Sequence, residues 1–426
     1  MVARRIRLTI RPERLQCPYA ISSPMPGACG PPCGEGWLVS TPSIRVFHAG
    51  CKQGFLDKVD GAVAAGGSGR AVLTAPLINR RFEEIFMRGV VMHGPGDVSV
   101  EERERPQIVE PTDAIIRVPA SCICGSDLWP YRGIAEMNGP TPMGHEYVGI
   151  VEEVGDAVSI IKPGQFVVGS FFASDNTCEI CRAGYQTHCV QRQPGAATGA
   201  QSEFVRIPLA DGTLVATPGQ PDSELIPSLL AASDVLGTGW FAAVAAQAGP
   251  GKTVTVVGDG AVGLLAVLAA KQLGAERIIA MSRHESRQKL AREFGATDIV
   301  EERGDEGVGR VKELTGGLGA HSVVEAVGTE ESMRQAIRST RPGGHVGYVG
   351  VFHDVALPVE ELFFSGINLH GGPAPVRRFL PEFIDLIWNR RIDPGQVFDL
   401  ELPLDQAAAG YEAMDTRQAI KVLLRS

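Results

Sequence analysis

Two groups of cysteine, histidine and carboxylate residues have the spacing of metal ligands. The first group opens with Cys124 in the segment Cys-Gly-Ser-Asp and closes with the adjacent pair His145 and Glu146. One thiolate, one imidazole and a further protein ligand, with a fourth position left open, form the usual ligand set of a catalytic zinc. A buried cysteine or histidine without a metal is also common, so this spacing becomes specific only beside other features of the chain.

The second group is a short loop with four sulfur or oxygen ligands. Asp175, Cys178 and Cys181 follow one another at intervals of three positions, and Cys189 lies eight positions further on. Three thiolates and one carboxylate can close a tetrahedron around Zn²⁺. The alternative is a group of three free cysteines. Because the loop has few apolar side chains to hold it together, we favour a structural zinc ion.

A glycine-rich turn follows a short apolar strand in the second half of the chain. The strand that begins at Val254 runs directly into Gly258-Asp-Gly260-Ala-Val262-Gly263, after which a helical pattern begins. Glycines permit the tight turn and the approach of a pyrophosphate to the backbone, and the helix N-terminus offers N–H groups to the phosphates. A lone motif of this kind is weak evidence, but here a second strand ends about 20 residues later, as a dinucleotide-binding unit requires. We expect Gly258, Gly260, Val262 and Gly263 to bind the cofactor.

The second strand of this unit ends in Ser282 and Arg283, with Arg287 one helical turn further on. NAD-binding units usually carry an acidic residue at this point, which accepts a hydrogen bond from the ribose 2′-hydroxyl. A hydroxyl and two cations suit a 2′-phosphate instead. The acidic Glu285 argues against a phosphate site. The alternative interpretation is that these residues are ordinary surface residues at the start of a helix. We therefore favour NADP over NAD.

The rest of the chain supplies the elements that must position these groups. From Met87, short β-rich runs broken by Gly and Pro predict a domain of irregular strands. From about Val235, strands alternate with helices, which predicts an α/β fold with a parallel, doubly wound sheet. The predicted strands cover residues 87–93, 97–100, 114–118, 147–154, 253–257, 277–281, 298–300, 322–325 and 345–349. The clearest predicted helices cover residues 262–273 and 286–294.

The first 86 residues differ in charge from the remainder. They carry a net charge of +5, whereas the remaining residues carry −14. They are rich in Gly and Pro and show no sustained helical or strand period, so we expect them to be mostly disordered. Cys29 and Cys33 in this segment could bind a metal, but no second ligand pair follows, and incidental thiols are the better interpretation.

Length and composition limit the class of protein. A chain of 426 residues with 44% hydrophobic residues predicts two or three domains with substantial cores. The net charge of −9 argues against a nucleic-acid partner. There is no run of about 18 apolar residues, and no apolar segment follows Arg4, Arg5 and Arg7, so neither a membrane span nor a secretory signal is expected. We expect a cytoplasmic protein that binds neither nucleic acid nor membranes.

From Met87 to Ser426 the chain resembles the zinc-dependent medium-chain alcohol dehydrogenases. The resemblance rests on the Cys124 segment, the His145 segment 21 positions later, the cysteine loop and the Gly258 turn. It implies a β-rich, GroES-like catalytic domain, a Rossmann domain, and assembly into homodimers or homotetramers. The implied divisions are an extension over 1–86, a catalytic domain over 87–233 that is completed by 373–426, and a Rossmann domain over 234–372.

By position, the resemblance makes Cys124, His145 and Asp234 the ligands of the catalytic zinc. Asp234 stands where many members have a cysteine, shortly before a Thr-Gly pair, and an acid there is similar to the formaldehyde dehydrogenase and dismutase branch. Zn²⁺ with one thiolate, one carboxylate and a neutral imidazole has no net charge. Because Glu146 as a permanent ligand would make the site negative and less electrophilic, we expect it to be an outer or transient ligand.

The same comparison by position implies roles for residues around the zinc. Ser126 would take the proton of the alcohol, and Asp127 would orient His145. Trp129 stands where the family often has the histidine that ends a proton relay, so the relay would run through water or the cofactor ribose. Trp129 and Phe171 would give the substrate site apolar walls.

Further positions would contact the cofactor. Lys421 matches a basic residue that reaches the pyrophosphate, whereas Gly125 stands where some members have a phosphate-binding arginine. The nicotinamide would be lined by Thr238, Val349 and Val351.

Together these features predict a zinc-dependent oxidoreductase with a catalytic and a structural zinc ion in each chain. It would transfer a hydride between NADP(H) and a small alcohol or aldehyde. Two alternatives stay open. One is an NAD-linked enzyme similar to formaldehyde dehydrogenase or dismutase. The other is a catalytically silent protein that binds zinc and a nucleotide, an idea that only Trp129 supports.

The change in charge and pattern at Met87 leads to a first prediction. A chain that begins at Met87 should fold and turn over substrate like the full chain, because every motif and every patterned element follows that residue. The measurements are thermal unfolding and steady-state kinetics of both chains under identical conditions. A clear loss of activity or of melting temperature in the shorter chain would contradict the prediction.

Overall fold

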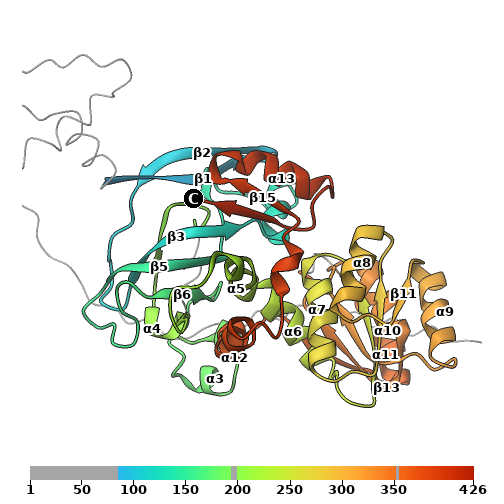
Figure 1. The fold of residues 1–426 in the computed structure, drawn as a ribbon. Coiled ribbons are helices and arrows are strands. Elements are labelled where there is room, and N and C mark those ends of the chain that lie inside the picture. The colour runs from blue at the N-terminus through green and yellow to red at the C-terminus, as the bar shows by residue number, and fades with distance from the viewer. Residues whose placement is uncertain (1–84, 193–198, 352–354) are drawn as a thin grey trace, which may run out of the picture. The chain divides into compact units, whose positions relative to one another are not determined.

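The computed structural model describes residues 85–192, 199–351 and 355–426. The predicted extension over 1–86 therefore lies outside the described residues apart from its last two positions, and so do Cys29 and Cys33. The described residues form a β-rich part and an α/β part, as the sequence predicts (Figure 1).

The β-rich part contains two sheets. The smaller has the strand order β2-β1-β4, and the larger has the order β15-β16-β3-β5-β6-β8, with β7 paired to β3. Their strands are β1 (Phe86–Gly94), β2 (Asp97–Glu104), β3 (Ala114–Cys122), β4 (Thr141–Pro142), β5 (Tyr147–Val154), β6 (Phe166–Gly169), β7 (Phe204–Ile207), β8 (Leu214–Ala216), β15 (Leu400–Pro403) and β16 (Val422–Arg425). The predicted strand pair after residue 86 is present as β1 and β2, and the predicted strands at 114–118 and 147–154 are present as β3 and β5.

Helices and turns connect these strands, and α2, η3, α3 and η4 lie at the predicted cysteine motifs. The α-helices are α2 (Leu128–Tyr131), α3 (Glu179–Arg182), α4 (Ala210–Thr213), α5 (Ile226–Ala232), α12 (Val376–Trp388) and α13 (Ala407–Asp415). The 3-10 turns are η3 (Gly125–Asp127), η4 (Gln186–His188), η5 (Ser223–Leu225), η6 (Pro394–Val397) and η7 (Leu404–Gln406).

The C-terminal segment completes the larger sheet. β16 is antiparallel to β3, with Leu423 opposite Cys122, and it also pairs with β15. The apolar run of β16 fits a strand that has neighbours on both sides and is covered on both faces. Helix α13 brings Tyr411 into the same hydrophobic cluster as Val90 and Met92 of β1. The end of the chain is therefore part of the β-rich domain.

Six parallel strands form the sheet of the α/β part, in the order β11-β10-β9-β12-β13-β14. The strands are β9 (Thr253–Val257), β10 (Arg277–Met281), β11 (Asp298–Val300), β12 (Ala320–Glu325), β13 (Thr340–Tyr348) and β14 (Asn368–Gly371). The helices are α6 (Val235–Ala245), α7 (Ala261–Gln272), α8 (Glu285–Phe294), α9 (Gly304–Leu314), α10 (Glu330–Ser339) and α11 (Val359–Ser365). The predicted alternation is confirmed. Because the strand order reverses direction at β9, a ligand site is expected at the carboxyl ends of β9 and β12.

Alternate residues of each central strand enter different hydrophobic clusters. Ile278 and Ala280 of β10 pack in the cluster that contains α6, α7 and α8. Ile279 and Met281 pack in the cluster that contains α9 and α10. Helices thus cover both faces, which explains the nearly continuous apolar runs of these strands.

Helix α6 links the two parts. One hydrophobic cluster runs from Val148 of β5 through α6 to Leu264 of α7. A Cβ atom on Gly239 would lie 2.7 Å from the carbonyl oxygen of Val262, so α6 packs directly against the first turn of α7. This close contact fixes Asp234, the residue before α6, relative to the glycine turn that precedes α7.

Within the described ranges, no single helix is both long enough and apolar enough to cross a membrane. One pair, Ser223–Ala232 and Val235–Ala245, meets the criterion by length and composition only, with a bend of 46° between its two helices.

Candidate active site

Four side chains from three separate segments converge on one point. Cys124 lies between β3 and η3, His145 and Glu146 lie directly before β5, and Asp234 lies between α5 and α6. One ligand atom from each residue lies within 4.8 Å of the others. His145 Nε2 is 3.4 Å from Asp234 Oδ2, and Cys124 Sγ is 3.9 Å from the same oxygen. The fold therefore brings the three predicted ligands together, with Glu146 as a fourth neighbour.

Asp127 holds the first of these segments in place. Its Oδ2 accepts hydrogen bonds from the backbone N–H of Cys124 at 2.9 Å and from Gln201 Nε2 at 3.1 Å. Its Oδ1 is 3.6 Å from His145 Nδ1, which leaves Nε2 facing the other ligands. Gln201 accepts in turn from the Tyr411 hydroxyl at 3.0 Å. The sequence motif predicted Asp127 here but gave no signal for Gln201 or Tyr411, which lie far away in the chain.

Thr238 orients the carboxylate of Asp234. Its hydroxyl donates to Asp234 Oδ1 at 2.6 Å, which leaves Oδ2 for His145 and Cys124. Burial opposes ionisation of Asp234. The hydrogen bond and the charge of His145, followed by the hydrogen bond from Thr238, nevertheless lower the pKa of Asp234 below its ordinary value. This contact adds a role that the sequence did not indicate. The expected contact of Thr238 with nicotinamide stays a prediction.

Glu146 and Lys421 form a buried ion pair beside the ligands. Lys421 Nζ is 2.7 Å from Glu146 Oε1 and donates to the carbonyl oxygen of Ile123 at 3.1 Å. The side chains of Lys421 and Glu146 are 1% and 0% exposed. Burial raises the pKa of Glu146, although the ammonium of Lys421 acts in the opposite direction. The contact of Lys421 with a pyrophosphate stays a prediction, and its contact with Glu146 is a feature that the sequence did not reveal.

The chemistry of this donor set fits a zinc ion. Glu146 Oε2 is buried and has no hydrogen-bond partner within the part of the chain described. A buried carboxylate oxygen without a partner is costly unless a positive charge compensates it. Burial disfavours a charged imidazole, but Cys124 and Asp127 raise the pKa of His145 well above its ordinary value. A cation is thus favoured here, and Cys124, His145 and Asp234 are the ligand types that zinc prefers.

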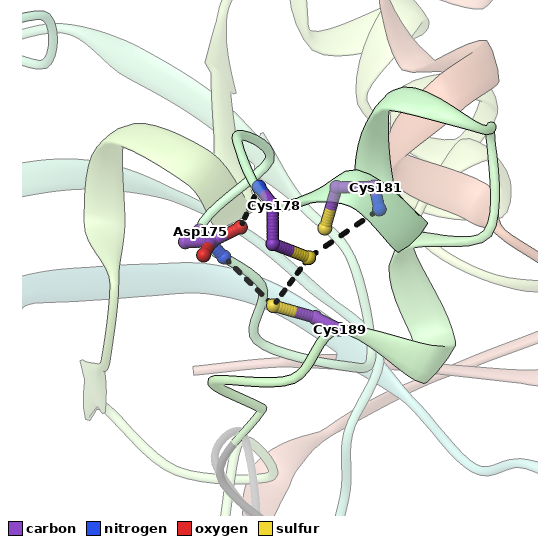
Figure 2. Close-up of side chains that lie close together, drawn as sticks. All are labelled: Asp175, Cys178, Cys181 and Cys189. Carbon is purple, nitrogen blue, oxygen red and sulfur yellow. Dashed lines mark hydrogen bonds between the residues drawn. The ribbon is translucent and has the colours of Figure 1, made fainter.

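A second cluster occupies the loop between β6 and β7 (Figure 2). Ligand atoms of Asp175, Cys178, Cys181 and Cys189 all lie within 4.8 Å of one another. The Cys178 and Cys189 sulfur atoms are 3.9 Å apart, and Cys178 also caps the N-terminus of α3. The four residues predicted for a structural zinc are therefore brought together.

Backbone N–H groups point at the sulfur atoms of this loop. Cys178 Sγ accepts from the N–H of Cys181 at 3.4 Å, and Cys189 Sγ accepts from the N–H of Asp175 at 3.4 Å. Burial opposes ionisation of Asp175, but backbone N–H groups that donate to it, including that of Cys178, lower the pKa of Asp175 to about 2. Three sulfur atoms and one carboxylate at such short range fit a closed tetrahedral zinc site.

The glycine turn between β9 and α7 has the geometry that a dinucleotide requires. Gly258 has a φ of +121°, and a Cβ atom on Gly263 would clash with the carbonyl oxygen of Gly258. A Cβ atom on Gly260 would meet no atom within 4 Å, so the space before the first turn of α7, which contains Val262, is open. An open helix N-terminus suits a pyrophosphate.

An acid from the glycine turn, which the sequence motif did not single out, lies beside the end of β10. Ser282 is 1% exposed, and its hydroxyl donates to Asp259 Oδ2 at 2.8 Å. Arg287 Nη1 is 3.4 Å from Asp259 Oδ1, and Arg283 is exposed next to Ser282. Asp259 lies inside the glycine motif. Because that motif is defined by its glycines, it does not predict that the Asp259 side chain reaches β10.

The remaining predicted residues surround the first cluster or the carboxyl edge of the parallel sheet. Ser126 lies in η3, directly after Cys124, and Trp129 lies in α2. The ring centroid of Phe171 is 6.2 Å from that of His145. Beyond the carboxyl end of β13 lie Val349, which is partly buried, and Val351, which is 53% exposed.

Two protein-family profiles match these domains. Residues 110–218 match the alcohol dehydrogenase GroES-like domain, and residues 261–389 match the zinc-binding dehydrogenase domain. The chain belongs to the medium-chain zinc alcohol dehydrogenase family. The resemblance predicted from the sequence is thereby confirmed, as are the GroES-like and Rossmann folds of this dehydrogenase.

Three relatives illustrate the likeness. Zinc-type alcohol dehydrogenase B of Aspergillus flavus is 35% identical over 352 residues, which cover 80% of this chain and 81% of the relative. The NADP-dependent isopropanol dehydrogenase of Thermoanaerobacter brockii is 34% identical over 327 residues, which cover 73% of this chain and 91% of the relative. The solved structure of an alcohol dehydrogenase from Thermus sp. ATN1 has a TM-score of 0.73 and 34% identity, covering 80% and 99%.

The two ligand clusters predict separable effects of cysteine removal. Cys124→Ala should lower kcat/KM by about a hundredfold or more with little change in melting temperature, because it removes one ligand from a zinc site that has an open position. Cys181→Ala should lower the melting temperature and the zinc content, because closed zinc sites contribute folding free energy. The measurements are kinetics, thermal unfolding and elemental analysis.

Cys122→Ala is the matched control, since it removes a buried thiol that belongs to neither ligand set. It should keep the zinc content of the parent. The prediction fails if the folded parent holds a single zinc ion or none, or if the two ligand variants lose activity and stability in the same proportion.

Proposed function

We propose that this dehydrogenase interconverts small alcohols and aldehydes, with NADP(H) as the preferred cofactor and a catalytic and a structural zinc ion in each chain. The observation that carries the proposal is the cluster of Cys124, His145 and Asp234 at the start of the helix that packs against the cofactor turn. When bound, zinc supplies polarisation of the substrate oxygen and nicotinamide supplies the two-electron transfer.

The residues of this chain would bind the substrate and handle its proton. Ser126 makes no hydrogen bond that competes for its hydroxyl within the described ranges, so it is free to accept the proton of an alcohol. Phe171 lies against His145 and presents an apolar surface that suits a carbon chain. Since Trp129 replaces the family's relay histidine, the proton would leave through water or through the ribose of the cofactor.

The cofactor preference is supported by the charges around Ser282. Arg287 approaches within 3.4 Å of the neighbouring carboxylate, and Arg303 donates to the carbonyl oxygen of Met281 at 3.3 Å. Burial lowers the pKa of Arg303. The carboxylate of Asp259 acts in the opposite direction, and the charge of Arg283 lowers this pKa further. The three guanidinium groups of Arg283, Arg287 and Arg303 favour a doubly charged phosphate. The name of the Thermoanaerobacter brockii relative states NADP dependence, which is in keeping with this proposal.

An NAD-linked enzyme similar to formaldehyde dehydrogenase is the second candidate, because the ligand before α6 is Asp234 rather than cysteine. A catalytically silent protein is the third. A screen that crosses both cofactors with primary alcohols, secondary alcohols and aldehydes separates the three. The absorbance of the reduced nicotinamide should change with at least one pair, and its absence with every pair would refute the enzymatic proposal.

Self-association into dimers or tetramers is supported by one exposed region. Phe363 and Phe364 of α11 are 80% and 79% exposed, and Val359 is 69% exposed. They lie close in sequence to β14, the last strand in the order of the parallel sheet. An apolar patch beside a strand edge can meet its own copy across a twofold axis, which buries both patches.

The exposed patch predicts a change in oligomeric state. Phe363→Ser should weaken self-association by about tenfold or more, because burying a large apolar side chain contributes about 1.5–3 kcal/mol. Val109→Ser is the control, since Val109 is 68% exposed in the β-rich part. Analytical ultracentrifugation over a concentration series measures both. A monomeric parent, or equal effects of the two substitutions, would contradict the prediction.

The arginines near Ser282 predict how substitutions at this site change the selectivity between NADP(H) and NAD(H). The parent should have a higher kcat/KM with NADP(H) than with NAD(H). Arg283→Ala and Ser282→Asp should each shift selectivity toward NAD(H) by about ten- to a hundredfold, because a hydrogen bond to a charged group contributes about 1.5–3 kcal/mol. A parent that prefers NAD(H), or an Arg283→Ala variant with unchanged selectivity, would refute the assignment.

A further inference from the structure

The residue between the first two glycines of the cofactor turn carries a charge and reaches across to the next strand. Asp259 Oδ2 accepts from the Ser282 hydroxyl at 2.8 Å, and Asp259 Oδ1 is 3.4 Å from Arg287 Nη1. The side chains of Asp259 and Arg287 are only 17% and 11% exposed. The carboxylate of Asp259 is therefore the partner of the hydrogen-bond donors Ser282 and Arg287 near the end of β10.

These donors are the ones that the proposed function assigns to a 2′-phosphate. Ser282 has a single O–H to donate, and the guanidinium of Arg287 faces Asp259. A phosphate that binds here must take the Ser282 proton from the carboxylate and share or displace Arg287. The carboxylate of Asp259 thus competes with the phosphate for the same partners.

The two cofactors differ in how they meet this carboxylate. The 2′-hydroxyl of NAD(H) is a donor, and a carboxylate with two oxygens keeps lone pairs free after it has accepted from Ser282. The 2′-phosphate of NADP(H) is an anion, and like charges at close range in a largely buried site repel strongly. Asp259 therefore favours NAD(H) relative to NADP(H), in opposition to the three arginines.

We propose that Asp259 is a specificity-determining residue that occupies the place of the 2′-phosphate and weakens the preference for NADP(H). The proposal rests on the cofactor site of the proposed function at the end of β10. It does not depend on which cofactor the parent prefers.

A purely structural role for Asp259 has a different signature. If the carboxylate only holds the glycine turn against β10, its replacement should weaken the binding of both cofactors by the same factor. Asparagine at this position keeps an oxygen that can accept from Ser282 and removes only the charge. Asp259→Asn therefore separates the electrostatic role from the structural one.

The test is equilibrium binding of cofactor fragments to the full chain, without turnover. Adenosine 2′,5′-bisphosphate and AMP are titrated by calorimetry into the parent and into Asp259→Asn. Asp259→Ser is a second variant that removes the charge with a different side chain. Glu276→Gln is the matched control, because Glu276 is an exposed acid that directly precedes β10, at the opposite end of the same strand from Ser282. Thermal unfolding verifies the fold of each variant.

The expected result is a rise of about tenfold or more in the ratio of the AMP Kd to the bisphosphate Kd for both Asp259 variants. The control should keep the ratio of the parent. An unchanged ratio in both Asp259 variants, or an equal rise in Glu276→Gln, would overturn the proposal. If the parent binds the bisphosphate no better than AMP, the proposed NADP preference fails, while a rise in the ratio on Asp259→Asn still supports the role of Asp259.

Discussion

The carboxylate of Glu146 is buried beside the sulfur of Cys124 and the carboxylate of Asp234, and its charge has to be balanced inside the protein. Lys421 provides that balance from the far end of the chain. Removing one partner of a buried ion pair costs about 3–5 kcal/mol, because the other charge is left without compensation. The pairing of β16 with β3 and the buried side chains of β16 place Lys421, the residue directly before that strand, beside Glu146.

Helix α6 positions several residues on the cofactor side of the site. Asp234 precedes α6, Thr238 in its first turn fixes the carboxylate, and Gly239 lets the helix approach α7 closely. One buried helix thus sets both the orientation of the Asp234 carboxylate and its place relative to the glycine turn. Because this helix belongs to a hydrophobic cluster formed by residues of both domains, buried packing sets the position of Asp234 directly before it.

Local patterns predicted the fold well, and the reason is visible in particular elements. β9, β10 and β11 are short apolar runs bounded by glycine or polar turns, so their ends match the predictions. Cys124, His145 and the cysteine loop could be identified because their spacing is set within one segment of chain. Gln201, Tyr411 and the partner of Lys421 could not, because a contact between residues more than 70 positions apart leaves no periodic trace in the sequence. Asp259 was missed for another reason: its side chain acts on the next strand, whereas its motif is recognised by backbone shape.

The β-rich sheet is interrupted in the chain by the whole α/β part, and this has a consequence for synthesis on the ribosome. β3 emerges early, but the edge of its Ala120–Cys122 segment is covered by β16, which consists of Val422–Arg425. A nascent chain therefore carries an unpaired strand edge next to Cys124 until β16 has been synthesised, and an unpaired edge can pair with a strand of another chain. Throughout that interval Glu146 also lacks its cation. When residues 421–425 have been added, β16 closes the sheet and Lys421 supplies the cation of Glu146 in the same step.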